Sequence, residues 1–257
     1  MATALITGAS NGIGLELARF HASKGGDLVL VARNKSKLDE IKTELEKKYN
    51  ISVYTIGKDL SVAKSAQEVY DQTTKQNIHI DYLFNNAGFG DFGMFAESDL
   101  DKQLQMISVN ITALTALTHL YLPGMIKKGS GKILNVASTA AFQPGPTMAV
   151  YYATKAYVLH FSEAIANELK GSGVTVTALC PGATESGFQS AADMQESKLV
   201  KGKKLPSAKE VALYGYRAMM KNRTVAIHGI LNYLMANSVR FAPRAMIVKV
   251  ARSMQDK

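Results

Sequence analysis

Residues 2–14 have the sequence Ala-Thr-Ala-Leu-Ile-Thr-Gly-Ala-Ser-Asn-Gly-Ile-Gly, in which an apolar run leads into a glycine-rich turn. An amphipathic helical pattern opens directly after it, which is the context that a nucleotide-binding turn requires. Glycine lets the backbone turn sharply, and free N–H groups at a helix N-terminus attract a pyrophosphate. The spacing is G-x-x-x-G-x-G, not the commoner G-x-G-x-x-G. A tight turn without a ligand is the alternative, but its position at the first strand–helix junction favours a bound cofactor.

Apolar runs rich in Val, Ile and Leu alternate with longer amphipathic stretches along the chain. The runs lie at residues 2–7, 28–32, 52–56, 81–84, 132–137, 174–179 and 224–227. Continuous apolar runs are typical of strands buried on both faces, and the stretches between them are typical of crossover helices. Because the composition does not change along the chain, the sequence predicts one α/β domain over residues 1–257. We expect a single doubly wound Rossmann-type parallel sheet of about seven strands, with helices on both faces.

The composition indicates a folded, basic chain. Its 257 residues are 47% hydrophobic and carry a net charge of +9. Cys180 is the only cysteine, which excludes an internal disulfide and favours a reducing compartment. We expect a cytoplasmic location, because there is no signal-peptide pattern and no uninterrupted apolar run long enough to cross a bilayer. The histidines have no ligand spacing, so we expect no metal, and no motif favours nucleic acid.

Tyr151 and Lys155 lie near the start of a helical pattern that runs to about Gly171. Residues four apart share one helical face, so the two side chains point the same way. A fixed ammonium beside a phenol favours the phenolate and lowers the pKa of the phenol from its usual value of about 10. Such a pair is suited to proton transfer near neutral pH. A core tyrosine beside a solvated lysine is the commoner explanation of this spacing when it stands alone.

Four residues, Gly12, Asn86, Ser138 and Pro181, lie just past the ends of predicted strands. In open α/β sheets, ligands bind outside the carboxyl ends of the strands. The carboxyl ends of parallel strands lie along one edge of the sheet. We therefore expect these residues to line one site.

Arg33 follows the second predicted strand, and no acid lies beside it. An acid near this position bonds the ribose 2′-hydroxyl of NAD, whereas an arginine suits the 2′-phosphate of NADP. The sequence therefore favours NADPH. The alternative is a solvated arginine at the end of a strand.

Two further polar residues have plainer structural interpretations. Asp59 follows the third predicted strand, where an aspartate often caps the next helix, here expected to begin near Ser61. Asn110 lies inside a helical pattern, where asparagine is unfavourable by propensity. It is either exposed on that helix or marks a helix that is kinked at a polar site.

Together these residues resemble the short-chain dehydrogenase/reductase family over about residues 2–190. They occur in the family's order and spacing. The matching positions are Thr7–Gly14, Asp59, Asn85–Gly88, Asn110, Ser138, Tyr151, Lys155 and Pro181–Gly182. The later region around residues 240–244 is most similar to bacterial ketoreductase-type members.

The resemblance implies catalytic roles for four residues. Tyr151 would protonate a carbonyl oxygen as hydride arrives, or accept the proton of an alcohol in reverse. Lys155 would lower the pKa of Tyr151 and hold the nicotinamide ribose. Ser138 would hydrogen-bond the substrate oxygen. Asn110 would hold a water that links Lys155 to a proton relay.

The resemblance also implies where NADP(H) binds. The positions are Gly8, Ser10, Asn11, Gly12, Ile13, Gly14, Arg33, Asp59, Leu60, Asn86, Ala87, Gly88, Tyr151, Lys155, Pro181, Gly182 and Thr184. One departure is visible, because Pro181-Gly182-Ala183-Thr184 is shorter than the family's usual Pro-Gly-x-x-x-Thr. Thr184 is nevertheless expected to meet the nicotinamide carboxamide.

The predicted function is an NADPH-dependent oxidoreductase that transfers a hydride between the nicotinamide and a carbonyl or alcohol substrate. The family implies a homodimer or homotetramer. One alternative is a catalytically silent NADP(H)-binding regulator, although all four catalytic positions are kept. The other is a reductase of a C=C or C=N bond on the same scaffold.

Two segments toward the C-terminus have their own predictions. Residues 185–206 follow the sixth strand without a strong helical pattern and are expected to form a substrate lid. Residues 229–257 are expected to form a helical extension. Its end is an amphipathic basic helix, because Met246, Ile247, Val250 and Met254 share one face. Such a helix suits an anionic membrane surface, but we favour packing on the protein, which covers the same apolar face.

Overall fold

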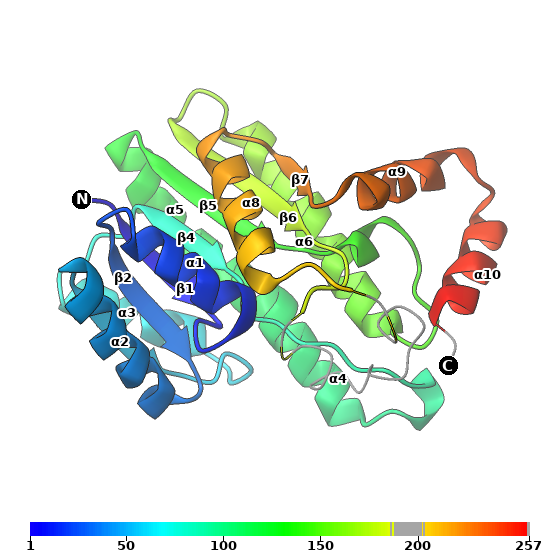
Figure 1. The fold of residues 1–257 in the computed structure, drawn as a ribbon, viewed down its shortest axis with the longest axis horizontal. Helices are drawn as coiled ribbons and strands as arrows, with labels where there is room; N and C mark the ends of the chain where they lie inside the picture. Colours follow the sequence, from blue (N-terminus) through cyan, green and yellow to red (C-terminus); the bar gives the residue numbers. More distant parts are fainter. Residues whose placement is uncertain (186, 188–201, 203, 256–257) are drawn as a thin grey trace.

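Parallel strands form one sheet at the centre of the structure (Figure 1). The computed structural model describes residues 1–185, 187, 202 and 204–255. In this part of the chain the sheet has seven strands in the order β3-β2-β1-β4-β5-β6-β7. The strands are Thr3–Thr7 (β1), Asp27–Ala32 (β2), Val53–Gly57 (β3), Tyr82–Asn85 (β4), Gly131–Val136 (β5), Val174–Cys180 (β6) and Val225–Ile227 (β7). Each ends within one residue of its predicted run, so the predicted fold class is confirmed.

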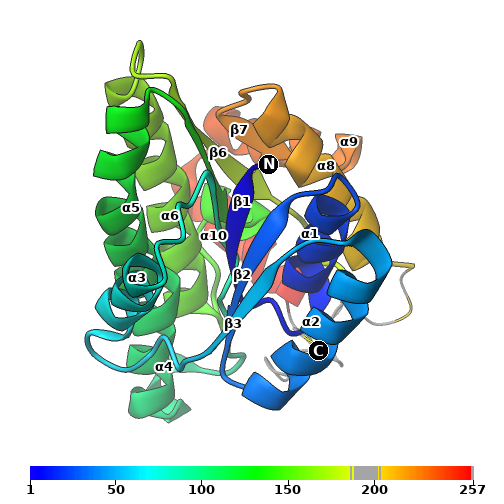
Figure 2. The same ribbon diagram turned by 90° about the vertical axis from the view of Figure 1, so that its left-hand side faces the viewer.

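Helices cover both faces of the sheet (Figure 2). One face carries α1 (Gly12–Ala22), α2 (Lys35–Tyr49) and α8 (Ala208–Met220). The other carries α3 (Ser65–Lys75), α4 (Leu100–Ile107), α5 (Leu114–Lys128) and α6 (Ala149–Glu168). Two further helices, α9 (Ile230–Ser238) and α10 (Arg244–Gln255), lie beyond β7 at one end of the molecule. They occupy the predicted C-terminal extension.

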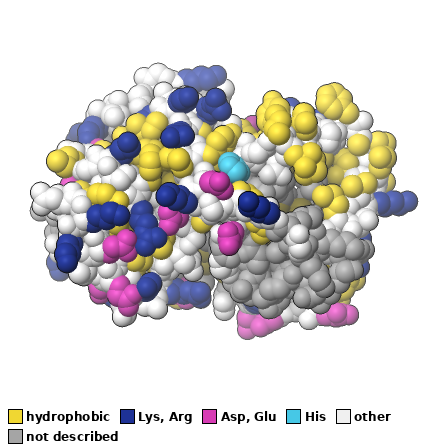
Figure 3. Space-filling model, viewed as in Figure 1, with side chains coloured by type: hydrophobic (Ala, Val, Ile, Leu, Met, Phe, Trp, Pro, Cys, Tyr) yellow, Lys and Arg dark blue, Asp and Glu magenta, His cyan; other side chains and the backbone are white. Residues whose placement is uncertain are grey.

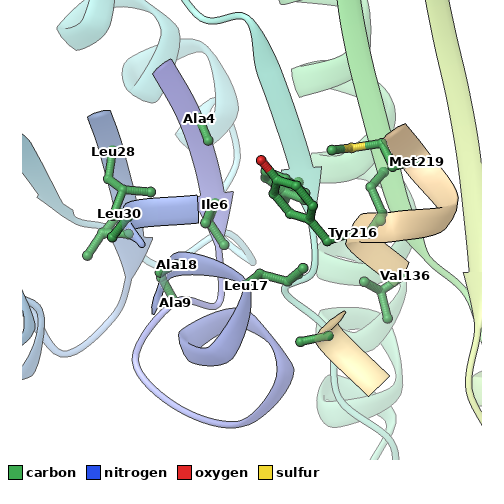
Figure 4. Close-up of a cluster of buried hydrophobic side chains, with 14 of the residues drawn as sticks. Ala4, Ile6, Ala9, Leu17, Ala18, Leu28, Leu30, Val136, Tyr216 and Met219 are labelled. Carbon is green, nitrogen blue, oxygen red and sulfur yellow. The ribbon is translucent and has the colours of Figure 1, made fainter. Parts of the chain in front are cut away.

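The core explains why the central strands carry apolar residues on both faces. In β1, Ala4 and Ile6 pack with Leu17 of α1 and Met219 of α8 (Figure 4). Leu5 lies between them in sequence and joins the cluster on the opposite face. Successive side chains of a strand point to opposite faces, so a sheet with helices on both sides buries apolar side chains on both of its faces.

The helix from Leu100 to Lys128 is continuous but not uniformly α-helical. Between α4 and α5, residues Ser108–Ala113 form a π-helical segment (η2). By length and composition alone this helix could cross a membrane, since it has 29 residues and a stretch of mean hydropathy 1.2. The sequence has no uninterrupted apolar run of this length, but this helix as a whole passes the length and composition test for a membrane span. Its Leu117 and Tyr121 are buried in the core beside the sheet, and packed core helices pass the same test.

The segment after β3 differs from the sequence-based prediction. Asp59 does not cap a helix at Ser61, because α3 begins only at Ser65. Instead its carboxylate accepts hydrogen bonds from the backbone N–H and the hydroxyl of Ser61, at 2.9 and 2.8 Å. Lys64 then adopts a left-handed conformation, with φ of 64°, and this turn delays the helix.

The proposed lid at residues 185–206 lies mostly outside the described residues. At its two ends, the backbone N–H of Glu185 donates to the carbonyl of Pro206 at 2.9 Å. Helix α8 then starts at Ala208 as expected. Ser207 and Glu210 form a reciprocal capping box at its first turn.

Candidate active site

A cavity of about 1400 Å³ lies at the carboxyl ends of the strands. It extends from the first strand–helix turn, past the ends of β2, β4 and β5, to the start of α6 and on to α9 and α10. Gly12, Asn86, Ser138 and Pro181 all line it, as the strand-end argument predicts. Of all the predicted site residues, Gly14 and Asn110 do not line it and lie behind its wall.

The glycine-rich turn is hydrogen-bonded to the residue that follows β4. Gly8 and Gly12 have positive φ angles of 65° and 54°. The side-chain amide of Asn86 donates to the carbonyls of Thr7 and Gly8, at 2.9 and 3.2 Å. A Cβ at Gly14 would lie 2.3 Å from the Gly8 carbonyl oxygen. Gly14 therefore allows α1 to pack against the turn, and it acts by close packing, without lining the cavity.

The turn opens the N-terminus of α1 into the cavity. Ser10, Asn11, Gly12 and Ile13 line this part of the wall. Asn11 is the N-cap, but its side chain makes no capping hydrogen bond. Unpaired N–H groups in a first helical turn suit a phosphate. The observed turn therefore fits the pyrophosphate of a dinucleotide.

Arg33 and Asp59 form another section of the cavity wall. Hydrogen bonds from Ser61 hold the pKa of Asp59 below its usual value, and the nearby charge of Arg33 contributes. The sequence shows no acid beside Arg33 at the end of β2, but the fold brings one from the end of β3. This neighbour was not predicted, because it depends on the pairing of two strands.

Ser138, Tyr151 and Lys155 meet at the centre of the cavity. Ser138 hydrogen-bonds to Tyr151. The ammonium of Lys155 lies 5.8 Å from the centre of the Tyr151 ring and donates to the carbonyl of Val136 at 2.7 Å. Lys155 is only 5% exposed. The predicted shared face of Tyr151 and Lys155 is therefore observed. The last residue of β5 supplies the backbone acceptor, and Ser138 follows two residues later.

Burial dominates the protonation of this group. It raises the pKa of Tyr151 above its ordinary value, while the hydrogen bond from Ser138 acts in the opposite direction. Burial also lowers the pKa of Lys155 to about 8. The pKa of Tyr151 is thus raised overall in this structure, whereas the sequence argument predicts a lowered value. The physical reason is that desolvation of the phenol outweighs an ammonium that is directed at Val136.

Asn110 lies in the π-helical segment and is 1% exposed. Its amide donates to the carbonyl of Phe89 and to the hydroxyl of Thr154, both at 3.0 Å, and its oxygen accepts from the N–H of Phe89 at 3.2 Å. The interpretation as an exposed helix residue is therefore wrong. The alternative, a helix kinked at a polar site, is supported in part, because the helix departs from α-helical geometry at Asn110 as a π-helical segment.

Gly88 shows how closely these elements approach. A Cβ on this residue would lie 2.9 Å from the Asn110 side-chain oxygen and 3.4 Å from the Lys155 nitrogen. Thr154 precedes Lys155 on α6, so the Asn110 contacts fix the start of that helix against the loop after β4. Asn110 thereby positions the backbone behind Lys155.

Thr184 lies where the sequence predicts a contact with the nicotinamide carboxamide. It lines the cavity and is 6% exposed. Its hydroxyl donates to the carbonyl of Gly182 at 3.0 Å. The shortened segment after β6 therefore still delivers this side chain to the site.

The far part of the cavity is formed by α9, the 3-10 turn η4 (Val239–Phe241) and α10, which we call the C-terminal wall. It contributes mainly Leu, Ile, Val, Met and Ala side chains. Helix α10 is held by the buried Gln255, whose amide donates to the hydroxyl of Tyr152. Its oxygen accepts from the hydroxyl of Thr147 at 3.1 Å. The sequence predicts the amphipathic helix, but it gives no signal for Gln255.

Comparison with known proteins gives the family. The family model for short chain dehydrogenases matches residues 2–197. The chain belongs to the short-chain dehydrogenase family. Its predicted membership and its class as an oxidoreductase are thereby confirmed.

Relatives of this short-chain dehydrogenase include proteins with named activities. An uncharacterized oxidoreductase from Staphylococcus epidermidis is 31% identical over 82% of this chain and 90% of its own length. The very-long-chain 3-oxoacyl-CoA reductase of Rattus norvegicus is 34% identical over 69% of this chain. The match spans 58% of that reductase.

Solved structures of similar proteins share the fold over most of its length. A short-chain dehydrogenase from Sphingobium yanoikuyae in complex with NADPH is 30% identical, with a TM-score of 0.83 and 94% of each chain covered. A bulky-bulky ketone specific alcohol dehydrogenase from Comamonas testosteroni is 29% identical, with a TM-score of 0.80. It covers 94% of this chain and 92% of that one.

The described residues of this short-chain dehydrogenase contain no group of three or more His, Cys, Asp or Glu side chains that could hold a metal ion. Cys180 is buried, and burial raises the pKa of its thiol. The titratable groups that line the cavity include the tyrosine–lysine pair and the charged residues near Arg33, together with Asp99, Lys102 and Lys204.

Proposed function

We propose that the protein is an NADPH-dependent reductase of carbonyl compounds, and that it can also oxidise the corresponding alcohols. The observation that carries this proposal is the meeting of Ser138, Tyr151 and Lys155 in one cavity with an open glycine-rich turn. An acid, a hydrogen-bond donor and a dinucleotide cradle are the groups that hydride transfer to a carbonyl needs from a protein.

Each catalytic residue has a proposed role in this reaction. The nicotinamide, when bound, supplies the hydride. The hydroxyl of Tyr151 gives its proton to the carbonyl oxygen, and the hydroxyl of Ser138 donates a hydrogen bond to that oxygen as negative charge develops. The raised pKa of Tyr151 keeps the phenol protonated before the reaction. Lys155 then stabilises the phenolate that remains, since its ammonium lies beside the ring.

The remaining predicted residues would hold the cofactor and the proton relay. The turn residues from Gly8 to Ile13 and the β4 end from Asn86 to Gly88 would contact the dinucleotide, as would Leu60 and Pro181. Asn110 would hold a water next to Lys155, as its family position implies. Thr184 would meet the nicotinamide carboxamide.

The proposed preference for NADPH rests on Arg33. Its side chain is exposed at the cavity edge beyond β2, where it can meet a 2′-phosphate. The relative from Sphingobium yanoikuyae was solved with NADPH, and the relatives from rat and Comamonas testosteroni are named for action on 3-oxoacyl or ketone substrates. These names support the choice of cofactor and of a carbonyl substrate.

An assembly of two or four copies is also proposed. Leu100, Leu104, Ile107 and Ile126 on α4 and α5 are between 37% and 63% exposed, which suits a contact between subunits. Light scattering coupled to size-exclusion chromatography measures the mass directly. A monomer at micromolar concentration would contradict this part of the proposal.

The function is tested by following oxidation of NADPH and NADH against a panel of aldehydes, ketones, enones and imines. We expect turnover with aldehydes or ketones and a higher kcat/KM with NADPH. NADPH binding without turnover of any compound would instead indicate a silent binding protein. Turnover confined to enones or imines would indicate a reductase of C=C or C=N bonds.

A further inference from the structure

The C-terminal wall presents an apolar surface to the cavity. Its lining side chains include Leu231, Met235, Val239, Met246, Val250 and Met254. The wall segment also carries four cationic residues, Arg240, Arg244, Lys249 and Arg252, and none of them lines the cavity. The polar side chains that the wall adds to the lining are Asn232 and Ser238, and the Asn232 amide is bonded to the carbonyl of His228 at 2.8 Å. The wall therefore offers a ligand almost only hydrocarbon and thioether contacts.

The cavity is large enough for a second sizeable ligand. Its volume of about 1400 Å³ exceeds that of a typical single small-molecule site, which is roughly 300–1,000 Å³. The glycine turn and the strand ends occupy one part of the lining, and the wall forms a separate part. The second ligand would therefore lie against the wall.

The apolar side chains of the wall remain partly uncovered. Leu231 is 66% exposed, Met246 56% and Val250 49%. Figure 3 shows hydrophobic side chains gathered over the end of the molecule formed by α9 and α10. A large, contiguous patch of exposed apolar side chains on a protein commonly marks a binding site. Methionine is flexible and polarizable, so it adapts to irregular apolar shapes.

The wall is fixed next to the reacting groups. Gln255 is 1% exposed and Ala251 is 4% exposed, and these two are the buried residues of α10. The partner of the Gln255 amide is the hydroxyl of Tyr152, the residue directly after Tyr151. A carbonyl held by Ser138 and Tyr151 would thus have its substituents next to the wall.

We propose that the C-terminal wall binds the hydrocarbon body of the substrate, so that the substrate is a ketone or aldehyde with a long or bulky apolar group. This inference rests on the proposed function for its chemistry. It adds the substrate class and names the residues that select it. A small or highly polar carbonyl compound would leave the wall without a partner.

The test is a series of straight-chain 2-ketones from 2-butanone to 2-dodecanone, measured for kcat/KM at saturating NADPH. Complete burial of one methylene group strengthens binding about fourfold. Because the wall is partly exposed, we expect kcat/KM to rise about twofold to fourfold for each added methylene. Calorimetry with the protein and NADP⁺, which has no hydride to give to a ketone, measures the affinity for the same ketones independently of turnover.

Pairs of variants test whether the dependence on chain length comes from the side chains that face the cavity. Each pair has one substitution on the cavity side of a helix and one on a neighbouring residue that does not line the cavity. Met235→Gln on α9 and Val250→Asn on α10 place a polar group in the lining and should flatten the rise with chain length. Leu234→Gln and Val248→Asn are the controls, since these neighbours are 58% and 37% exposed and do not line the cavity. The controls should keep the wild-type dependence on chain length.

The outcomes separate the two proposals. A kcat/KM and an affinity that do not change with chain length, beside good turnover of short ketones, would overturn the wall inference and leave the proposed function intact. Affinity that rises with chain length without any turnover would keep the inference and contradict the proposed chemistry. If the cavity variants and their controls lose the dependence on chain length equally, the wall inference is also overturned.

Discussion

The two sides of the cavity are built in opposite ways. The polar side consists of the glycine turn, the ends of β4 and β5 and the start of α6. There the side chains bond to one another, and Asn110 and Lys155 are almost completely buried. The C-terminal wall presents partly exposed apolar side chains, and α10 has only Ala251 and Gln255 as buried residues.

This difference separates reaction from substrate choice. Groups that stabilise a transition state must be held in place beforehand, which requires buried and mutually bonded side chains. A surface that accepts an apolar body needs little directional bonding, and few buried contacts leave it locally less stable. We therefore expect substitutions on the polar side to alter rate and cofactor choice, and those on the wall to alter substrate range and local stability.

The largest effect should follow from Tyr151→Phe, which removes the proton donor from the polar side. Loss of a positioned acid typically lowers the rate by roughly 10²–10⁴, while NADPH binding should be nearly unchanged. Tyr157→Phe on the same helix is the control, because Tyr157 is exposed and bonds to Thr115. Steady-state rates and NADPH fluorescence measure the two quantities. Full activity of the Tyr151→Phe enzyme would remove Tyr151 from the mechanism.

A smaller effect is expected from Arg33→Ala at the cofactor end of the polar side. A charge-assisted hydrogen bond is worth about 1.5–3 kcal/mol, so the ratio of kcat/KM for NADPH to that for NADH should fall by about one to two decades. Lys37→Ala is the control, since Lys37 pairs with Glu40 on the surface of α2. Adding Ala32→Asp to Arg33→Ala should shift the preference further toward NADH. An unchanged ratio in the Arg33→Ala variant would contradict the role of this residue.

Lys155→Met should raise the free energy of unfolding at pH 7 while it destroys activity. The drop of the Lys155 pKa from 10.5 to about 8 corresponds to a cost of about 3 kcal/mol. Loss of the hydrogen bond to Val136 lowers the free energy of unfolding by about 1 kcal/mol. The net gain in the free energy of unfolding is therefore about 2 kcal/mol. Chemical denaturation measures this gain, with the exposed Lys170→Met as the control.

The pH dependence of that gain follows from the direction of the shift. The folded protein holds the Lys155 proton less tightly than the unfolded chain does. The penalty is therefore complete below about pH 8 and disappears as the pH rises toward 10.5. The advantage of the methionine variant should shrink over that range. A variant that is less stable than the wild type at pH 7 would show that the buried ammonium stabilises the fold.

The smallest effect should come from Gln255→Ala, which loosens the wall and leaves the polar side intact. Loss of the contacts with Tyr152 and Thr147 should lower the opening free energy of α10 by about 1 kcal/mol. Hydrogen exchange followed by mass spectrometry measures this opening, with the exposed Ser253→Ala as the control. Exchange in β1 and α1 should not change. Faster exchange in both regions would mean that the two sides of the cavity open together.

The strands and their functional edge could be predicted from sequence because both follow from local patterns. Runs such as 28–32 are apolar throughout, since both faces of β2 are covered. Residues that follow strands then meet at one edge by the rule for parallel sheets, which is why Asn86 and Ser138 were placed correctly.

The remaining features depend on contacts between distant parts of the chain. The π-helical segment at Asn110 is held by Phe89 and Thr154, neither of which is visible from the helix itself. The raised pKa of Tyr151 depends on how deeply the finished fold buries the phenol. Gln255 bonds to a residue 103 positions away, and no local pattern distinguishes it from an ordinary polar residue near a helix end.

The order of the strands has a consequence for how the enzyme folds. β1 lies between β2 and β4, and its first residue bonds to Asp81, 78 positions later. Contacts this distant in sequence must close large loops, so parallel sheets form slowly and through intermediates. The wall follows β7 at the edge of the sheet, and its last helix is held by the bonds of Gln255 with Tyr152 and Thr147. During refolding from denaturant, helical circular dichroism should therefore return first, ketone turnover later, and discrimination between short and long ketones last.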